Sequence, residues 1–570
     1  MNFLPGRGVY RVLALVGYRL PETVTICLMP ETAPSGGLTC AYCPFHRKLA
    51  VRLIALTLAV TLFTQWLGFA LGTGAGPAPL FLWLAFGINL LVWSMIGVLR
   101  LGDDSARALL QRRAVPARRE VAVEPAPDAG DPERSEERVL VRSRAGGGGA
   151  AGTVVAGEGG GSDTPGAPSG GGVATRKAAP EQMKLAVIIP AHNEEPVIDG
   201  AITSALRLFN RWDIYVVSDS SRDATADIAA ETGINVLELL SNRGKAGAIE
   251  AVIQEFDLTE NYDGVVILDA DTALDEKYVE GAKRQLLDPS VAAVAGFVVA
   301  EWKPKERTVI GRLISAYRDR LYWMLQYLLR FGQTWRHTST TFIVPGFASV
   351  YRSSVLKQLD INPKGLVIED FNMTFEVHHR RLGRISMKPG TKAYCQDPFT
   401  LGDYVKQVRR WTLGFWQTVR RHGVWPSVFW FALFFYIMEV LLVASLLIIT
   451  TGLAVFTLLP VITGEAILGL GWYAAAYTEV TVVLPLTAIA IGMFVPDYVL
   501  TCVMATVRRR PSYLFYGLFF LPMRLIDSYL TLRTIPQAWT TKAPTVSGRA
   551  RCGPPAGCEP TRTTTAQRST

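Results

Sequence analysis

The sequence predicts an α/β domain with a mainly parallel β-sheet, set between apolar segments that are long enough to cross a membrane. Three observations lead to this fold class. The middle of the 570-residue chain alternates short β-rich runs with helical patterns, long apolar segments precede and follow it, and hydrophobic residues make up 49% of the composition. A chain of this length and composition is too apolar to be purely soluble. A membrane component is therefore expected.

Two apolar segments lie near the N-terminus, at residues 49–71 and 80–98. A spanning helix needs about 20 predominantly apolar residues, so residues 49–99 are predicted to form two transmembrane helices. Basic residues precede the first segment and follow the second, which places both flanks in the cytoplasm. Residues 1–48 are then an N-terminal cytoplasmic tail. Within this tail, Cys40 and Cys43 with His46 nearby leave zinc binding open as an alternative to reduced thiols.

The stretch from residue 100 to residue 182 is rich in glycine, proline, alanine and arginine, and it contains the runs AGGGGAAG and GEGGGSDTPGAPSGGG. Such a composition buries too little apolar surface to offset the entropy of ordering the chain. We therefore predict a disordered linker over residues 100–182.

Residues 183–401 have the pattern of the α/β domain. Helical segments begin at Glu195, Thr225 and Lys245, and they alternate with five β-rich runs: LAVIIP, IYVVS, INVLEL, VVILDAD and VAAVAGFVV. This alternation is typical of βαβ units and a mainly parallel sheet, in which ligands bind at the carboxyl ends of the strands. Polar residues that directly follow a strand are therefore candidates for a site.

Residues 307–330 predict a further helix, whose apolar stripe is typical of core or of membrane-facing surface and is assigned no chemistry. Residues 402–424 predict an amphipathic helix at the membrane surface. Residues 425–531 predict about three transmembrane or re-entrant segments, the first broken at Gly452 and the second interrupted by Asp497. The last of these segments contains charges and lies either across the membrane or in its interface. Residues 532–570 form a C-terminal tail.

The formal net charge of +9 is compatible with two kinds of partner. Nucleic acid is not expected, because no basic stripe with interleaved aromatic residues lies in a soluble module. Anionic lipid headgroups explain the charge more simply, so the lipid bilayer is the expected partner.

The predicted strand VVILDAD ends in two carboxylates, Asp269 and Asp271, one residue apart. Side chains alternate along a strand with a period of two, so both carboxylates leave it on the same side. There they can meet a hard cation or a phosphate. A solvated strand end is the alternative that this spacing alone leaves open.

Seven short motifs follow one another along the chain. They are PAHNEE (190–195), SDSSRDAT (218–225), NRGKAGA (242–248), DAD (269–271), VPGFASVYR (344–352), IED (368–370) and QVRRW (407–411). This ordered set resembles the inverting family 2 glycosyltransferases, and within them the membrane-embedded branch of hyaluronan, chitin, cellulose and poly-N-acetylglucosamine synthases. The resemblance runs from residue 184 to the C-terminal spans. It implies a nucleotide-sugar-binding domain of GT-A type, inserted between N-terminal and C-terminal transmembrane helices.

The resemblance implies a sugar-nucleotide donor site with Mg²⁺ or Mn²⁺ as cofactor. Asp271 matches the metal ligand, and Asp269 matches the residue that contacts the nucleotide beside the metal. Asp219 matches the residue that reads the uracil and ribose, and Asp223 belongs to the same nucleotide-binding motif. Lys245, near a helix N-terminus, matches a diphosphate contact.

The resemblance also implies which residue activates the acceptor. Asp370 matches the base that takes the proton from the acceptor hydroxyl, with Glu369 beside it. An isolated Glu-Asp pair is otherwise typical of a charge at the N-terminus of a helix.

The motif QVRRW implies a helix that closes the donor site. Gln407 and Arg410 match donor-site residues, since arginine can contact phosphate oxygens in a bidentate way. Trp411 matches a residue that stacks on the acceptor sugar, and Gly346 is assigned to the same acceptor site. Tryptophan and arginine are also common anchors at a membrane interface.

The chain departs from the family pattern in two places. Residues 218–225 lack the first acid and both glycines of the usual nucleotide-binding run, which puts the conformation of that loop in doubt. Ile368 stands where many relatives carry threonine, a change that is not expected to affect the base.

The resemblance implies a processive membrane glycosyltransferase that transfers a sugar from a UDP-sugar, with inversion, to a growing β-linked polysaccharide and exports it. The layout of two spans before the domain and about three after it favours an N-acetylglucosamine polymer. The protein is expected in the plasma (inner) membrane with its catalytic domain in the cytoplasm. Two alternatives stay open: a non-processive glycosyltransferase with a lipid acceptor, and a catalytically inactive nucleotide-binding membrane scaffold.

Overall fold

The structure is a computed structural model, and it describes residues 54–62, 64–65, 68, 87–114 and 183–540. The predicted N-terminal tail, with Cys40 and Cys43, lies outside these residues, as do most of the predicted linker and most of the C-terminal tail. Residues 54–62 are helical, and α4 spans Ile88–Ala114. The two transmembrane helices predicted within residues 49–99 are described only in part, so they stay a prediction.

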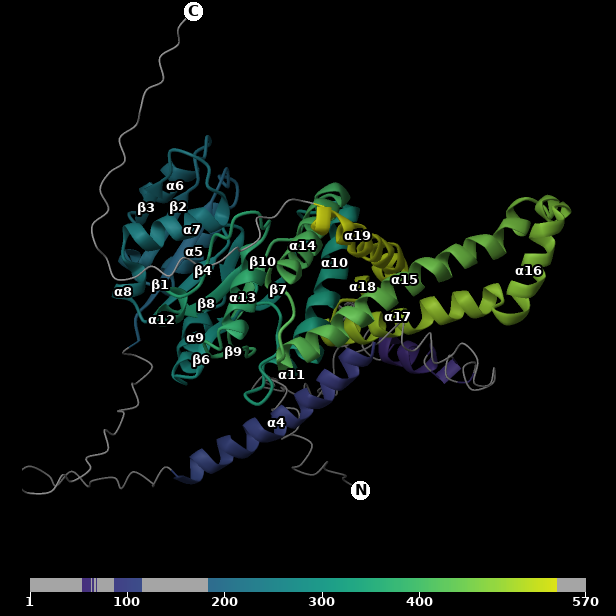
Figure 1. The fold of residues 1–570 in the computed structure, drawn as a ribbon, viewed down its shortest axis with the longest axis horizontal. Coiled ribbons are helices and arrows are strands. Elements are labelled where there is room, and N and C mark those ends of the chain that lie inside the picture. The colour runs from purple at the N-terminus through teal and green to yellow at the C-terminus, as the bar shows by residue number, and fades with distance from the viewer. Residues whose placement is uncertain (1–53, 63, 66–67, 69–86, 115–182, 541–570) are drawn as a thin grey trace, which may run out of the picture. The chain divides into compact units, whose positions relative to one another are not determined.

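Seven strands form the main sheet, in the order β3-β2-β1-β4-β8-β6-β9. Their bounds are β1 (Leu185–Ala191), β2 (Ile214–Ser218), β3 (Asn235–Glu238), β4 (Gly264–Leu268), β6 (Val291–Ala295), β8 (Ala348–Arg352) and β9 (Arg384–Ser386). The pairs β1–β2, β1–β4, β2–β3 and β6–β9 are parallel, whereas β8 runs antiparallel to both β4 and β6. The predicted α/β class with a mainly parallel sheet is therefore confirmed (Figure 1).

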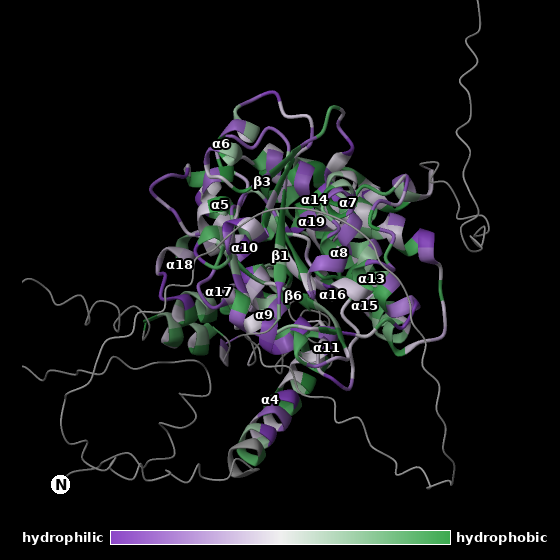
Figure 2. Cartoon of the chain, turned by 90° about the vertical axis from the view of Figure 1, so that its left-hand side faces the viewer, coloured by the Kyte–Doolittle hydropathy of each residue, from purple (hydrophilic) through white to green (hydrophobic). Residues whose placement is uncertain are grey.

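The central strands are buried on both faces, which explains why they are continuous apolar runs in the sequence. Along β1, Val187 and Ile189 belong to one cluster of buried apolar residues, and Ile188 belongs to another. Alternate side chains point to opposite faces of a strand, so these clusters are the two halves of the core. Figure 2 shows the central strands coloured as hydrophobic. The helices connecting them are α5 (Ile198–Leu206), α6 (Thr225–Glu231), α7 (Gly244–Glu255), α8 (Leu258–Asn261) and α9 (Tyr278–Leu286), with a short turn η2 (Arg211–Asp213).

A second, three-stranded sheet has the order β5-β10-β7, with bounds β5 (Thr272–Leu274), β7 (Phe297–Ala300) and β10 (Lys392–Cys395). The prediction of a single strand over VAAVAGFVV is wrong, because this run forms β6 and β7, which belong to different sheets. Gly296 separates them. A Cβ atom there would overlap the backbone carbonyl oxygen of Ala348, so only glycine lets the chain change sheets at this point.

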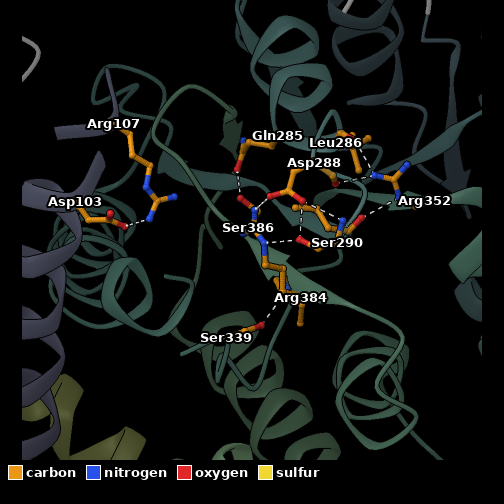
Figure 3. Close-up of polar contacts among 12 residues, drawn as sticks. Asp103, Arg107, Gln285, Leu286, Asp288, Ser290, Ser339, Arg352, Arg384 and Ser386 are labelled. Atoms are coloured by element: carbon orange, nitrogen blue, oxygen red, sulfur yellow. Dashed lines mark hydrogen bonds and ion pairs between the residues drawn. The ribbon is translucent and has the colours of Figure 1, made fainter. Parts of the chain in front are cut away.

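The edge strand β9 is held to the sheet by side chains as well as by its backbone (Figure 3). Arg384 donates from Nε to Ser290 Oγ at 3.0 Å and pairs with Asp288. Ser386 donates to Gln285 Oε1 of α9 at 2.7 Å. Charged and side-chain-bonded edges oppose pairing with a further strand, so the sheet ends here.

After the second sheet, the chain forms a helix that joins the sheet to the C-terminal helices. α10 (Val309–Met324) continues into a π-helical turn, η3 (Leu325–Arg330), and then into α11 (Phe331–Gln333). The helix predicted over residues 307–330 is therefore present. Its charged residues are buried along with its apolar stripe: Arg318, Asp319 and Arg320 are 1%, 3% and 4% exposed.

Three helices follow α11 within the sheet domain: α12 (Ser353–Leu356), α13 (Glu369–His379) and α14 (Leu401–His422). α14 covers the segment predicted as an amphipathic helix. It packs against α13 and against the last helix, α19 (Phe520–Thr540). Its position at a membrane surface stays a prediction.

The remaining C-terminal elements are α15 (Val428–Ile462), η4 (Ala466–Gly469), α16 (Gly471–Val483), α17 (Leu486–Arg508), α18 (Ser512–Tyr516) and η5 (Gly517–Phe519). α15 runs without interruption through Gly452, so the predicted break is wrong; one glycine costs a helix only about 1 kcal/mol. Among the described helices, α15 and α17 are the two that are long and apolar enough to cross a membrane. Figure 1 shows them side by side, with α16 at one end of the pair.

Three carboxylates lie between α10 and the C-terminal helices, and each is hydrogen-bonded. Asp497 of α17 accepts from Arg320 and from Arg524, both at 2.9 Å. Asp527 of α19 accepts from two tyrosine hydroxyls at 2.8 and 2.6 Å: Tyr317 and Tyr404. Asp319 of α10 accepts from two arginines and a tyrosine: Arg508, Arg510 and Tyr513. These bonds fix α10 to α17, α18 and α19.

α4 is attached to the sheet domain by Arg100, which is 3% exposed. Its Nη1 donates to the carbonyl oxygen of Phe331 at 2.5 Å, and its Nη2 donates to the carbonyl oxygen of Met387 at 2.9 Å. The predicted disordered linker is therefore wrong at its start, because residues 100–114 continue α4. Hydrogen bonds from a buried arginine stabilise this turn in a way that composition alone does not reveal.

Candidate active site

Most of the predicted site residues lie around one cavity with a volume of about 510 Å³. It lies where the carboxyl end of β4 meets α7, α13 and α14, as expected for a ligand site in an α/β fold. The predicted residues that line it are Lys245, Asp269, Asp271, Gly346, Glu369, Asp370, Gln407, Arg410 and Trp411. Asp219 and Asp223 are not in its lining.

Asp269 and Asp271 follow β4 at the point where the chain leaves the main sheet for the second one. The backbone N–H of Asp269 donates to the carbonyl oxygen of Phe347 at 2.8 Å, and that of Thr272 donates to the carbonyl oxygen of Asp269 at 3.0 Å. This tight turn, between β4 and β5, brings both carboxylates into the lining of the cavity. Burial and the neighbouring charge of Asp269 raise the pKa of Asp271 to about 7.

Lys245 connects the carboxylates from both sides of the cavity. It stands in the first turn of α7, with its Nζ 2.7 Å from Asp269 Oδ1 and 3.1 Å from Glu369 Oε1. The same Nζ donates to the carbonyl oxygen of Gly346 at 3.1 Å. Although burial opposes it, the charges of Asp269 and Glu369 raise the pKa of Lys245 above its usual value, so the lysine stays positive.

Glu369 and Asp370 are the first two residues of α13. Asp370 accepts from the backbone N–H of Gly346 at 3.3 Å and of Phe371 at 2.7 Å. Burial, and then the charge of Glu369, raise the pKa of Asp370 to about 7. Burial also raises the pKa of Glu369, but the charge of Lys245 outweighs it and brings this pKa below its usual value.

Two adjacent carboxyl groups thus differ in their protonation. Glu369 is ionised and paired with lysine, whereas Asp370 titrates near neutral pH. When their surroundings give two neighbouring carboxyl groups different pKa values, one group can serve as acid or base and the other as a fixed charge. Of the two predicted catalytic residues, Asp370 is the one suited to accept a proton.

The paired carboxylates after β4 have the chemistry of a divalent-cation site shared with a phosphate. Mg²⁺ is typically held by one or two carboxylates together with phosphate oxygens and water. In the part of the chain that the structure describes, no group of three or more His, Cys, Asp or Glu side chains is placed to hold a metal ion by itself. Asp269 and Asp271 therefore fit a cation that takes its remaining ligands from a bound diphosphate.

The two predicted nucleotide-reading residues of the motif SDSSRDAT bond to neighbouring loops. Asp219, directly after β2, is 3% exposed and accepts from the backbone N–H of Arg243 at 2.7 Å. Asp223 accepts from the backbone N–H groups of Thr225, at 3.1 Å, and Glu195, at 3.2 Å. Asp219 thereby shapes the loop that carries Lys245, and Asp223 fixes the turn before α6. Their contact with a nucleotide stays a prediction.

Arg410 and Trp411 follow Gln407 on α14 by three and four residues, the spacing that brings side chains to one face of a helix. Arg410 is close enough that its charge contributes to the lowered pKa of Glu369. Gln407 Oε1 accepts from Arg318 at 2.6 Å, and the guanidinium of Arg318 lies 4.5 Å from the centroid of the Trp411 ring.

Several lining residues carry no signal in the sequence. An apolar part of the cavity is formed by residues of α10, η3 and α15 together with the loop before β8: Leu321, Leu325, Leu329, Phe342 and Tyr436. Arg330, the last residue of η3, also lines it. The π-helical turn and the long-range packing of α15 set these positions, and neither follows from local periodicity.

Comparison with known proteins identifies the domain. A family model described as glycosyl transferase family group 2 matches residues 264–495, from the start of β4 into α17. This range contains the four cavity carboxylates and the motif QVRRW. Residues 264–495 are thus similar to a family 2 glycosyltransferase domain.

Two curated relatives show the similarity in sequence. The poly-beta-1,6-N-acetyl-D-glucosamine synthase of Staphylococcus aureus (strain COL) is 26% identical over 242 residues, which cover 40% of this chain and 54% of that protein. The probable glycosyltransferase YdaM of Bacillus subtilis (strain 168) is 27% identical over 253 residues, which cover 42% of this chain and 57% of that protein. The chain thus spans about half the length of these curated relatives. The predicted resemblance to poly-N-acetylglucosamine synthases is confirmed.

Among solved structures, a mannosyltransferase from Pyrobaculum calidifontis, in complex with GDP-Man and Mn²⁺, is 20% identical and has a TM-score of 0.37. The match covers 55% of this chain and 87% of that one. Glucosyl-3-phosphoglycerate synthase from Mycobacterium tuberculosis, in complex with Mn²⁺, uridine-diphosphate and phosphoglyceric acid, is 17% identical, with a TM-score of 0.28. That match covers 43% of this chain and 81% of the other. At these TM-scores both structures resemble the chain only loosely.

Proposed function

We propose that the protein transfers a sugar from a UDP-sugar, with inversion, to a growing β-linked polysaccharide. The observation that carries this proposal is the pairing of two carboxylate sets across one cavity, Asp269 with Asp271 and Glu369 with Asp370, joined by Lys245. One set suits a diphosphate leaving group, and the other suits an acceptor hydroxyl. The name of the S. aureus relative makes UDP-N-acetylglucosamine the first donor to test.

The diphosphate of the donor would lie beside Asp269, Asp271 and Lys245. Mg²⁺ or Mn²⁺, bound by the two aspartates, supplies positive charge to the diphosphate. Lys245 adds a point charge, and Arg410 of α14 can contact phosphate oxygens from the other side of the cavity. Charges held in place before the reaction stabilise the negative charge that develops on the departing UDP.

Asp370 would act on the acceptor. It takes the proton from the acceptor hydroxyl while the oxygen forms a bond to the anomeric carbon and the bond from that carbon to UDP breaks. A single displacement inverts the configuration and needs no covalent intermediate. Glu369 keeps Lys245 in place during this step, because the two form an ion pair at 3.1 Å.

The protein would act in the plasma (inner) membrane, with the glycosyltransferase domain in the cytoplasm. Supporting this, α15 and α17 are long and apolar enough to span a membrane, and α15 exposes large apolar side chains such as Phe431 and Val461. Exposed apolar surface of this extent is typical of contact with lipid. Processive synthesis and export through these helices are part of the same proposal.

UDP release by the purified protein, with a divalent cation and a panel of UDP-sugars, tests the reaction. Asp370→Asn should lower turnover by about 10²–10⁴-fold, the usual contribution of a general base. The matched control is Glu376→Gln on the same helix, because its amide oxygen can still accept from the Asp360 N–H, a bond of 3.0 Å in the structure. Equal turnover in the Asp370→Asn variant and the wild type would refute the assignment of the base.

The apolar part of the cavity favours a second candidate, a non-processive transferase with a lipid acceptor. Leu321, Leu325 and Leu329 line this part, and they suit an acyl chain better than a hydrated sugar. Product size separates the two candidates, since a single glycolipid band excludes processive synthesis. Any metal-dependent turnover excludes the catalytically inactive scaffold.

A further inference from the structure

The middle of α10 contains four consecutive buried residues, which are Tyr317, Arg318, Asp319 and Arg320. A helix turns by about 100° per residue, so four consecutive side chains point in all directions around its axis. α10 is therefore surrounded by other elements at this point. Tyr317, Asp319 and Arg320 bond to α17, α18 and α19, as described above.

Arg318 points instead toward α14. It is 1% exposed, and its Nη2 donates to Gln407 Oε1 at 2.6 Å. Its Nη1 donates to the hydroxyl of Tyr322 at 2.6 Å, and its guanidinium lies 4.5 Å from the centroid of the Trp411 ring. One side chain thus contacts two of the three residues of the motif QVRRW that line the cavity.

The contact fixes the orientation of the Gln407 amide. Guanidinium groups carry only hydrogen-bond donors, so the amide atom that faces Arg318 must be the oxygen. The NH₂ group of Gln407 then points away from Arg318. A cavity-lining amide held in this way presents donors to whatever binds in the cavity.

The same guanidinium supports the ring of Trp411. It lies over the aromatic face within the range of a cation–π interaction. Arg318 thereby occupies one face of the indole, and a sugar can stack only on the other. Lysine in place of Arg318 would keep the positive charge but would lose the planar group that bonds Gln407 and covers Trp411 together.

We propose that Arg318 is a positioning residue, which holds the amide of Gln407 and the ring of Trp411 in their working orientations. The proposal rests on the proposed function, because it assumes that these two residues contact donor and acceptor. Arg318 itself does not line the cavity and is not assigned a contact with substrate.

A double-mutant cycle tests this role. Arg318→Lys should lower kcat by about 10- to 100-fold, the loss expected when a displaced group misplaces the substrate. The affinity for UDP, measured by calorimetry, should stay within about twofold, because the substitution leaves the proposed diphosphate contacts in place: Asp269, Asp271, Lys245 and Arg410. In a Gln407→Ala background, Arg318→Lys should have much less effect than in the wild type, because coupled residues are not additive. Arg312→Lys on the same helix is the matched control and should keep wild-type kcat.

Gln407→Glu gives an independent check that does not depend on the folding of Arg318→Lys. The carboxylate still pairs with Arg318, but the NH₂ donors are gone, so kcat should fall while thermal stability is kept. Wild-type kcat in Gln407→Glu would overturn the proposed amide orientation. Additive effects in the cycle, or a parallel loss of UDP affinity in Arg318→Lys, would show a purely structural arginine and overturn the proposal. A wild-type protein that releases UDP from no sugar nucleotide would instead refute the proposed function.

Discussion

Clusters of carboxylates occur in two regions of this molecule, and the two sets differ in how they are paired. Those between α10 and the C-terminal helices have two or more donors each: Asp319, Asp497 and Asp527. Of those that line the cavity, Asp269 and Glu369 share Lys245, and Asp271 and Asp370 stand beside them. The two sets therefore serve different purposes.

Carboxylates with several hydrogen-bond donors hold helices together, whereas carboxylates placed next to one another prepare a site for a ligand. The pKa values of Asp271 and Asp370 reflect this arrangement, since burial and a neighbouring carboxylate raise both to about 7. Sites of catalysis characteristically keep such unfavourable charge because the ligand relieves it. The predictions below test this contrast, beginning with the largest effect.

Removing a cavity carboxylate should destroy activity and spare stability. Asp271→Asn should lower turnover by about 10²–10³-fold, the loss typical when a group that stabilises developing charge is removed. Its thermal stability should not fall, because the substitution relieves repulsion with Asp269. Chelation of divalent cations should abolish turnover by the wild type, and added Mg²⁺ or Mn²⁺ should restore that turnover. A variant that loses stability but keeps turnover would place Asp271 with the structural carboxylates.

Removing a helix carboxylate should do the reverse. Asp497→Asn removes the negative charge that pairs with Arg320 and Arg524. Breaking a buried ion pair in this way costs about 3–5 kcal/mol of stability. Thermal unfolding in detergent measures the loss, and the affinity of the folded fraction for UDP should not change. The control is Asp403→Asn, whose partner Lys406 is exposed, so that losing this surface pair should hardly change the melting temperature. Equal melting temperatures for the two variants would contradict a structural role of Asp497.

The pH dependence of turnover should reveal the raised pKa of Asp370. Burial and Glu369 raise its pKa to about 7, and a base works only when deprotonated, so kcat/KM should fall about tenfold per pH unit below this value. Glu369→Gln removes a neighbouring negative charge, and the acidic limb should therefore move to lower pH. A profile that is flat between about pH 6 and 8 would contradict the role of Asp370.

The sequence predicts the sheet side of the site well, because strand ends and motifs are local features. Asp269, Asp271, Lys245 and Asp370 all reach one cavity, as expected from residues that follow strands or begin helices. Asp219 and Asp223 are the exceptions. A carboxylate after a strand can bind a ligand or fix a loop, and the pattern is the same for both.

The contacts that α10 makes with later helices cannot be predicted in this way. Arg318 and its neighbours have the appearance of charges on a helix surface, and their partners lie 89 to 210 residues further along the chain. Only the folded structure brings Gln407 and Asp527 to α10. The split of one β-rich run at Gly296 escaped local patterns for the same reason, because it depends on the distant carbonyl of Ala348.

The attachment of α4 through Arg100 has a mechanical consequence. Arg100 is bonded to Phe331, and Phe331 directly follows η3, whose Leu325, Leu329 and Arg330 form part of the cavity wall. A displacement of α4 along its axis would therefore act on that wall through Arg100 and Phe331. The position of α4, which precedes the sheet domain in the chain, is in this way coupled to the position of η3.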